Sequence, residues 1–171
     1  MNVASIIRRA EQRDLHALIQ LIQKCIQRMR ENGIDQWDEI YPDKTLLEKD
    51  IQSRTIYVCE SGGQLSGCVT LNDVQDPAYA SIDWGLEEPP IGIIHRLMVS
   101  PDFQGRGLGR ALMSHIEKEA MHQGIRTIRL DAFTGNPAAL AVYEKIGYKR
   151  AGIVQFRKGP FWCFEKRVGH V

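Results

Sequence analysis

Apolar residues recur at helical spacing in several stretches of the chain. The longest stripe predicts a helix that Asp14 caps and that ends near Gly33, and a second stripe predicts a helix that Gly124 stops. Shorter helices are expected over residues 45–53 and from Asn136 onward, where Pro137 would take the first helical position. The two long stripes consist of Leu15, Leu18, Ile22, Cys25, Ile26 and Met29, and of Leu108, Ala111, Leu112, Ile116 and Ala120.

Short β-branched or apolar runs lie before, between and after these helices. Residues 6–9 form the first, and residues 55–60 and 65–71 read as a hairpin around Ser61-Gly62-Gly63-Gln64. Further strands are predicted over residues 91–99, at the alternating Ile128, Leu130 and Ala132, and in a closing hairpin of residues 153–156 and 161–165. The predicted order is strand, two helices, three strands, helix, strand, helix and two strands.

Length and composition fit a single globular domain over residues 1–171. The chain is 43% hydrophobic, enough for one core, and its 22 basic and 21 acidic side chains leave a net charge of +1. That balance provides no overall field for nucleic acid or a membrane surface, so we expect neither as a partner.

Targeting signals and cysteine pairs do not stand out. The N-terminus has no apolar run with a cleavage site, and no stretch reaches about 18 consecutive apolar residues, which predicts a cytoplasmic protein. The four cysteines, Cys25, Cys59, Cys68 and Cys163, form no C-x-x-C pair and fall in apolar patterns. We therefore expect reduced core residues and no metal site, although Cys68 or Cys163 could in principle serve as a nucleophile.

The most informative stretch is a glycine-rich loop where the strand at 91–99 leads into a helix. Glycines at 105, 107 and 109 would let backbone N–H groups approach a ligand, and the helix start adds unpaired amides and a positive dipole end. The expected guest is a phosphate or pyrophosphate. No Gly-Lys-Ser/Thr closes a Walker loop, and Arg110 stands where a dinucleotide fingerprint needs its third glycine. Asp131 could still imitate that fingerprint's ribose-binding acid.

Gln104-Gly105-Arg106-Gly107-Leu108-Gly109 resembles the Q/R-x-x-G-x-G/A motif of the GNAT (GCN5-related) N-acetyltransferase family. Asn136 to Tyr143 resembles the family's N-x-x-A-x-x-x-Y signature, with Ala139 between the two ends on one helix face, and Glu144 to Tyr148 continues the likeness. Taken alone, each motif has an ordinary structural explanation: a glycine-rich turn for the first, and for the second a capping Asn with a Tyr packed in the core. The two motifs in this order are far more specific.

The resemblance covers nearly the full length and implies an α+β fold. The expected fold has about four helices around a mixed, mostly antiparallel sheet of about seven strands, of which the fourth and fifth splay apart. It also implies acetyl-CoA as co-substrate. Backbone groups of Leu97, Met98 and Val99 would bind the pantetheine arm, and amides of the 104–110 loop would bind the pyrophosphate. The implied cofactor-binding residues are Leu97, Met98, Val99, Gln104, Gly105, Arg106, Gly107, Leu108, Gly109, Arg110, Asn136, Ala139 and Tyr143.

Acyl transfer needs an oxyanion donor, an acid for the thiolate and a route for the amine proton. By family analogy Tyr143 would be the acid. Many relatives use a glutamate on the fourth strand, but Gly92-Ile93-Ile94-His95-Arg96 contains no carboxylate. His95, which shares strand parity with Leu97 and Val99, is the candidate base; removal of the proton by water is the alternative.

The acceptor is the least determined partner. We expect a primary amine on a small molecule, an amino terminus or a lysine, attacking acetyl-CoA directly. Residues 73–90 carry five acidic and no basic side chains, which would favour a cationic amine if they border the site, and Trp37 and Trp84 could bind the acceptor or anchor the core. A non-catalytic acyl-CoA sensor is the alternative function, and a homodimer remains open.

Overall fold

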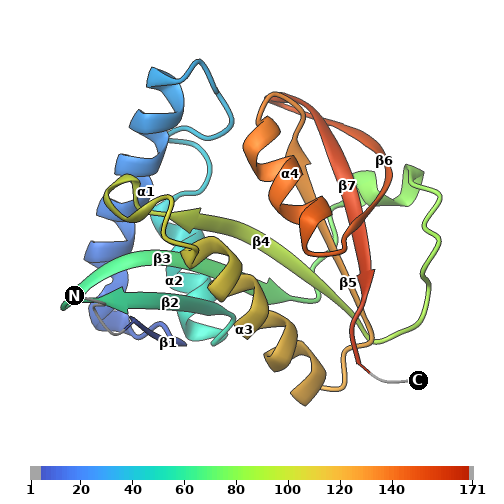
Figure 1. Ribbon diagram of the computed structural model, residues 1–171, viewed down its shortest axis with the longest axis horizontal. Coiled ribbons are helices and arrows are strands. Elements are labelled where there is room, and N and C mark those ends of the chain that lie inside the picture. The colour runs from blue at the N-terminus through green and yellow to red at the C-terminus, as the bar shows by residue number, and fades with distance from the viewer. Residues whose placement is uncertain (1–4, 170–171) are drawn as a thin grey trace. The chain divides into compact units, whose positions relative to one another are not determined.

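The structure, a computed structural model, describes residues 5–169 (Figure 1). Its helices are α1 (Leu15–Glu31), α2 (Lys44–Gln52), α3 (Leu108–His122) and α4 (Pro137–Lys145). Its strands are β1 (Ser5–Arg9), β2 (Ile56–Ser61), β3 (Gln64–Asn72), β4 (Ile91–Val99), β5 (Thr127–Phe133), β6 (Lys149–Phe156) and β7 (Gly159–Arg167). This order confirms the predicted sequence of elements. Three short 3-10 turns, η1 (Gln12–Asp14), η2 (Pro77–Ser81) and η3 (Pro101–Phe103), were not predicted.

The strands form one sheet in the order β1-β2-β3-β4-β5-β7-β6. The pairs β1–β2, β2–β3, β5–β7 and β6–β7 are antiparallel, whereas β4 and β5 run parallel. Their ladder extends only from Ile91 with Thr127 to Ile94 with Leu130, a short contact that agrees with splayed strands. The predicted α+β fold with a mixed, mostly antiparallel sheet is confirmed.

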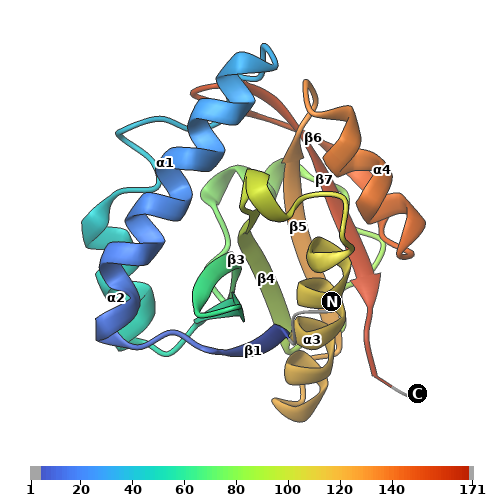
Figure 2. The same cartoon turned by 60° about the vertical axis from the view of Figure 1, so that its left-hand side comes forward.

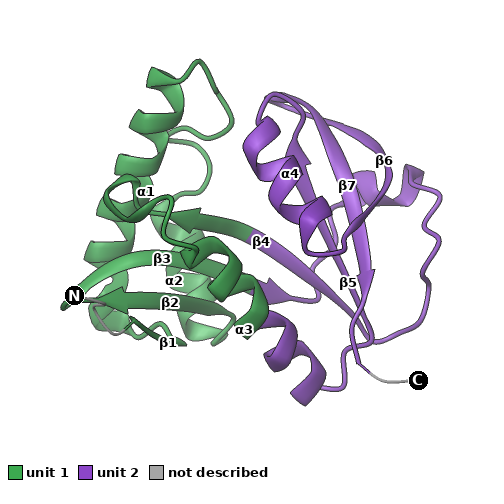
Figure 3. Ribbon diagram, in the orientation of Figure 1, with its two compact units in different colours: residues 1–70, 96–115 green, residues 71–95, 116–171 purple. Residues whose placement is uncertain are grey.

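The chain divides into two compact units (Figure 3). Unit 1 comprises residues 1–70 and 96–115, and unit 2 comprises residues 71–95 and 116–171. In unit 1, α1 and α2 lie together on one side of the strands (Figure 2) and share a core with Ile56, Val58 and Met98. Tyr57, which points the other way from β2, meets the ring of His115 on α3 at 5.7 Å between centroids.

Asp14 does not cap α1 with its side chain as predicted. Its carboxylate instead pairs with the Arg8 guanidinium at 2.7 and 2.9 Å and accepts the Glu11 N–H at 2.7 Å. The bidentate pair supplies two hydrogen bonds between ionised groups, so Asp14 joins β1 to the start of the helix.

Unit 2 covers the two faces of its strands differently. α4 packs against β7, where the Tyr143 and Phe164 rings lie 5.8 Å apart. On the other face, Tyr79 of η2 is buried with Ile93, Phe161 and Cys163. Tyr79, Ile82 and Trp84 therefore anchor the segment from η2 to residue 86 to this core, while Asp83 between them is exposed.

Candidate active site

Two glycines of the 104–109 loop adopt conformations that other residues rarely take. Gly105 has a φ of 76° and Gly107 a φ of 78°, both in the left-handed region. A Cβ at either position would meet nothing within 4 Å, so the requirement for glycine there is conformational. Gly109 lies outside that region, and a Cβ on it would touch Val99 Cγ2 at 3.6 Å.

This loop opens directly onto the first turn of α3. The Gly107 carbonyl accepts the Ala111 N–H at 3.0 Å, which makes Gly107 the residue before the first helical position. Helix geometry leaves the amides of Leu108, Gly109 and Arg110 without acceptors inside the helix. Arg106 and Arg110 are exposed, and the Arg106 guanidinium lies 5.3 Å from the Phe103 ring centre. Exposed amides, a helix dipole and two cations suit a pyrophosphate.

Gln104, the first residue of the motif, supports the strand that precedes the loop. Its side-chain amide donates to the Val99 carbonyl at 3.3 Å, and the Cys25 thiol donates to the same oxygen at 3.5 Å. Gln104 therefore has a structural contact of its own, and its predicted role toward the cofactor stays a prediction.

Arg96 interrupts the regular geometry of β4 with a φ of 54°. The prediction that His95 shares a face with Leu97 and Val99 assumed a regular strand. The alternation of faces is interrupted at Arg96, so that argument does not carry past it. The Arg96 carbonyl accepts the Cys68 thiol at 3.8 Å. Because the Arg96–Leu97 peptide is trans, the Leu97 N–H points away from Cys68 and β3.

The backbone of Leu97, Met98 and Val99 follows this irregular residue. Leu97 and Val99 are half-buried, whereas the Met98 side chain belongs to the core of unit 1. Only the main chain of Met98 is thus available for the predicted pantetheine contacts.

The cysteines serve as core residues. Burial raises the pKa of Cys25, of Cys68 and of Cys163 to about 12, so these thiols stay protonated at neutral pH. A protonated thiol is a poor nucleophile, which removes Cys68 and Cys163 as candidates. Cys59 is also buried and unbonded.

His95 has a defined tautomer. Its Nε2 lies 2.9 Å from Asn72 Oδ1, and the Val74 N–H donates to that same oxygen at 3.0 Å. Since an N–H donor requires the amide oxygen at this position, His95 Nε2 must carry a proton. In neutral His95, Nδ1 is therefore the nitrogen that can accept one.

Asp131 on β5 was considered from the sequence only as a possible ribose-binding acid and not as a base. Burial raises the pKa of its carboxyl to about 6, although the Tyr79 hydroxyl, which donates to it at 2.6 Å, lowers that pKa. Ile93 of β4 pairs with Arg129 of β5, so the next residues on the same face of these parallel strands are His95 and Asp131. The signal available in the sequence was an acidic residue inside the strand in which Ile128, Leu130 and Ala132 alternate as apolar positions.

Tyr143 lies on α4 with its ring against Tyr148 and Phe164, at 6.1 and 5.8 Å between centroids. Burial, and then the charge of Asp131, raises the pKa of the Tyr143 phenol well above its usual value. The hydroxyl therefore keeps its proton at neutral pH and can donate it but not act as a base.

Asn136 caps α4. Its side-chain oxygen accepts the Ala139 N–H at 3.2 Å, the arrangement expected of an Asn at a helix start. This contact accounts for Asn136 structurally but uses only the backbone of Ala139, and the predicted contacts of both with the cofactor stay predictions.

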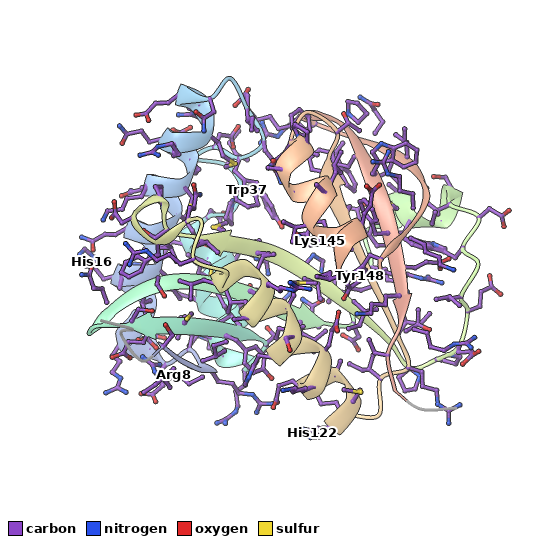
Figure 4. The ribbon with its side chains drawn as sticks, in the orientation of Figure 1. Arg8, His16, Trp37, His122, Lys145 and Tyr148 are labelled. Atoms are coloured by element: carbon purple, nitrogen blue, oxygen red, sulfur yellow. The ribbon has the colours of Figure 1, made fainter. Side chains whose placement is uncertain are left out.

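Both tryptophans proposed from the sequence for acceptor binding, Trp37 and Trp84, have core contacts. Trp84 donates its indole N–H to the Tyr79 carbonyl at 3.1 Å, and the Arg129 guanidinium lies 4.2 Å from its ring centre. Trp37, on the segment after α1 (Figure 4), packs against the core of unit 1. Their contribution to acceptor binding stays a prediction. The two contacts of Trp84 explain it as an anchor more fully than the packing of Trp37 does.

The acidic 73–90 segment is fastened to the strands of unit 2. Arg129 donates to the Gln75 side chain at 2.8 Å and to the Leu86 carbonyl at 2.9 Å. Glu165 accepts the N–H groups of Gly85 and Leu86, each at 2.9 Å. These contacts give the segment a fixed path while its carboxylates remain exposed.

A family model described as the Acetyltransferase (GNAT) family matches residues 15–148. Over 60 residues the chain is 40% identical to the ribosomal protein bS18 alanine N-acetyltransferase of Escherichia coli K12, a match that covers 35% of this chain and 40% of that enzyme. N-acetyltransferase 8B of Mus musculus is 29% identical over 120 residues, or 70% of this chain and 47% of that protein. The matches thus span less than half the length of either relative.

Solved structures share the fold at low identity. A GNAT-family acetyltransferase from Streptococcus agalactiae 2603 aligns with a TM-score of 0.85 at 21% identity, over 99% of this chain and 100% of that one. The ribosomal-protein-S18-alanine N-acetyltransferase of Escherichia coli aligns with a TM-score of 0.72 at 20% identity, over 98% and 96% of the two chains.

Proposed function

Because the chain belongs to the acetyltransferase (GNAT) family, we propose that it transfers an acetyl group from acetyl-CoA to a primary amine by direct attack. The observation that carries this proposal is the exposed loop at 104–107, whose two left-handed glycines lead into the free amides of the α3 start. The loop amides, with Arg106 and Arg110, would hold the pyrophosphate of acetyl-CoA.

Main-chain groups of β4 would serve the thioester. The backbone of Leu97, Met98 and Val99 would bind the pantetheine arm. The Leu97 N–H, which points away from β3, would donate to the thioester oxygen as negative charge develops on it. The amine forms the new N–C bond, and the C–S bond then breaks.

Tyr143 would assist the departing sulfur. Its raised pKa keeps the proton on the phenol oxygen at neutral pH, where it is available as a hydrogen-bond donor and acid. An ordinary thiol has a pKa of about 8.5, and at that pH the Tyr143 phenol is still protonated. The hydrogen bond itself would therefore supply much of the stabilisation of the thiolate.

Two side chains of unit 2 compete for the role of base. His95 could accept the amine proton at Nδ1, directly or through water. Asp131, with a pKa of about 6, is ionised at neutral pH and is a stronger base than an ordinary carboxylate. Of the two we propose Asp131, because the Tyr79 hydroxyl holds its carboxylate at 2.6 Å and its pKa is raised, as is typical of catalytic bases.

The acceptor we propose is a primary amine on a small molecule, a protein amino terminus or a lysine. The bS18 enzyme is named for acetylation of an alanine, which makes amino-terminal amines a reasonable first class to assay. Exposed Asp73, Asp76 and Asp83 in unit 2 would favour cationic acceptors, and Trp37 and Trp84 would add aromatic surface.

The sensor alternative is weakened by Asp131. Its main support was the lack of a carboxylate on the fourth strand, and the fifth strand supplies one. No helix among residues 5–169 is long and apolar enough to cross a bilayer. We propose the cytoplasm as the site of action, where buried thiols stay reduced.

Binding of CoA should depend on the conformation of Gly107. In the wild type, CoA at 100 times its Kd should stabilise the fold by about 2.7 kcal/mol, measured as a rise in Tm. Gly107→Ala should lose this shift, because alanine resists the left-handed φ and moves the loop amides. Gly33→Ala is the matched control, since Gly33 has a φ of 74° and equally open surroundings. A wild type whose Tm responds to neither CoA nor acetyl-CoA would overturn the proposal.

Replacement of Tyr143 by Phe should keep the ring packing and the CoA Kd but lower kcat by about 10²-fold, if thiolate departure limits the rate. Tyr148→Phe removes a hydroxyl from the neighbouring ring and is the control. Equal kcat values in Tyr143→Phe, Tyr148→Phe and wild type would assign Tyr143 to packing alone.

The two candidate bases predict different pH profiles of kcat/KM. A carboxylate base with a pKa of about 6 is active above that pH and is lost as the pH falls through it. Tyr79→Phe removes a donor that favours the ionised carboxylate, so the acid limb should move to higher pH. The acceptor should be an amine that stays neutral across the range, so that its own ionisation does not contribute.

If Asp131 is the base, Asp131→Asn should remove the acid limb and most of kcat/KM, whereas His95→Gln should retain the limb. The reverse result would assign the role to His95. A limb that survives both substitutions would leave proton removal to water.

A further inference from the structure

Arg96 is the centre of a buried polar network in unit 1. Its guanidinium forms an ion pair with Asp50 of α2, and the side chains of the two residues are only 5% and 6% exposed. The guanidinium also donates to the Tyr41 hydroxyl at 2.9 Å, and Thr70 of β3 donates to Asp50 at 3.3 Å. A residue of β4 is thereby joined to β3, α2 and the segment before α2.

Stability alone is a poor explanation for such a network. Removing two charges from water is costly, and an apolar pair of similar size is often at least as stable. Arg96 is also one of only two non-glycine residues among residues 5–169 with a positive φ, and the other, Arg54, lies in the turn after α2. A costly ion pair and a costly backbone conformation thus occur at the same residue.

We propose that Arg96 is a positioning residue, whose anchored side chain holds β4 in the left-handed conformation that orients the Leu97 N–H. The inference rests on the proposed function, in which that N–H donates to the thioester oxygen. An extended Arg96 would continue the regular strand and rotate its peptide away from the present orientation. The contacts with Asp50 and Tyr41 oppose this relaxation because it would pull the guanidinium out of them.

A separate contact, made by the Arg96 carbonyl, explains the direction of the peptide. The Cys68 thiol, whose pKa burial raises to about 12, donates to the Arg96 carbonyl from β3. The carbonyl is thereby held toward β3 and the Leu97 N–H away from it. The network fixes the side chain of Arg96 and the thiol fixes its carbonyl, so the intervening backbone has little freedom.

Replacement of Arg96 by glycine and by alanine distinguishes a role in positioning the backbone from a role in packing. Both lack the guanidinium, but only glycine adopts a φ near 54° without steric cost. We therefore compare Arg96→Gly with Arg96→Ala, each combined with Asp50→Asn so that no carboxylate is left buried and unpaired. Both double variants are compared with the wild type, because Asp50→Asn alone would leave the buried guanidinium without its carboxylate.

The glycine variant should keep kcat within about threefold of the wild type. The alanine variant should lose about 10- to 100-fold in kcat, less than or similar to removal of an oxyanion donor. The Kd of CoA, which has no thioester, should be the same in both. Equal kcat values in the two variants, or a parallel loss of CoA affinity, would overturn the proposal.

A measurement of backbone conformation keeps the test decisive. After correction for the change of the preceding residue, the Leu97 amide shift in a ¹⁵N-labelled protein should match the wild type in the glycine variant and differ from it in the alanine variant; this result does not require turnover. It therefore separates failure of this inference from failure of the proposed function, which an inactive wild type would show.

If the double variants do not fold, Tyr41→Phe removes one hydroxyl from the network. It should lower kcat several-fold at unchanged CoA Kd, with Tyr57→Phe as the control. An unchanged kcat in Tyr41→Phe would then count against the network.

Discussion

The ion pair between Arg96 and Asp50 joins the strand that would bind acetyl-CoA to α2. It lies where β4 departs from extended geometry, with a φ of 54° at Arg96. Residues before this point belong to the core of unit 2, and Met98 after it belongs to the core of unit 1. The irregular residue thus lies between the two parts of β4, and it turns a backbone N–H away from β3.

A second constraint is burial of the titratable groups of unit 2. Desolvation raises the pKa of Asp131 to about 6 and raises that of the Tyr143 phenol further above its normal value. At neutral pH the first group is ionised and the second is protonated, which are the states required of a base and an acid. The same physical effect thus prepares opposite roles, because a carboxyl and a phenol begin from different pKa values.

Much of the fold could be predicted from the sequence, because the stripes of α1 and α3 and the glycine turns are local patterns. The position of β7 between β5 and β6 could not, since strand order depends on distant contacts. The glycine loop was also predictable because left-handed positions select glycine. The left-handed Arg96 was not, because a tertiary ion pair, and not a glycine, accompanies it.

Asp131 was missed as a candidate base for a related reason. Its raised pKa arises from burial and from Tyr79, which is 52 residues away in sequence. Trp84 could be predicted as an anchor or as part of the site, and only its contacts with Tyr79 and Arg129 show the first role.

The most direct test of the account supplies purified protein with acetyl-CoA and a panel of primary amines, and measures free CoA and acetylated amine together. We predict that at least one amine raises CoA release in a saturable manner, with one acetylated product for each CoA released. If CoA binds but no amine raises its release above the background, or if CoA is released without an acetylated product, the chain is not an N-acetyltransferase for these acceptors and the central claim is contradicted.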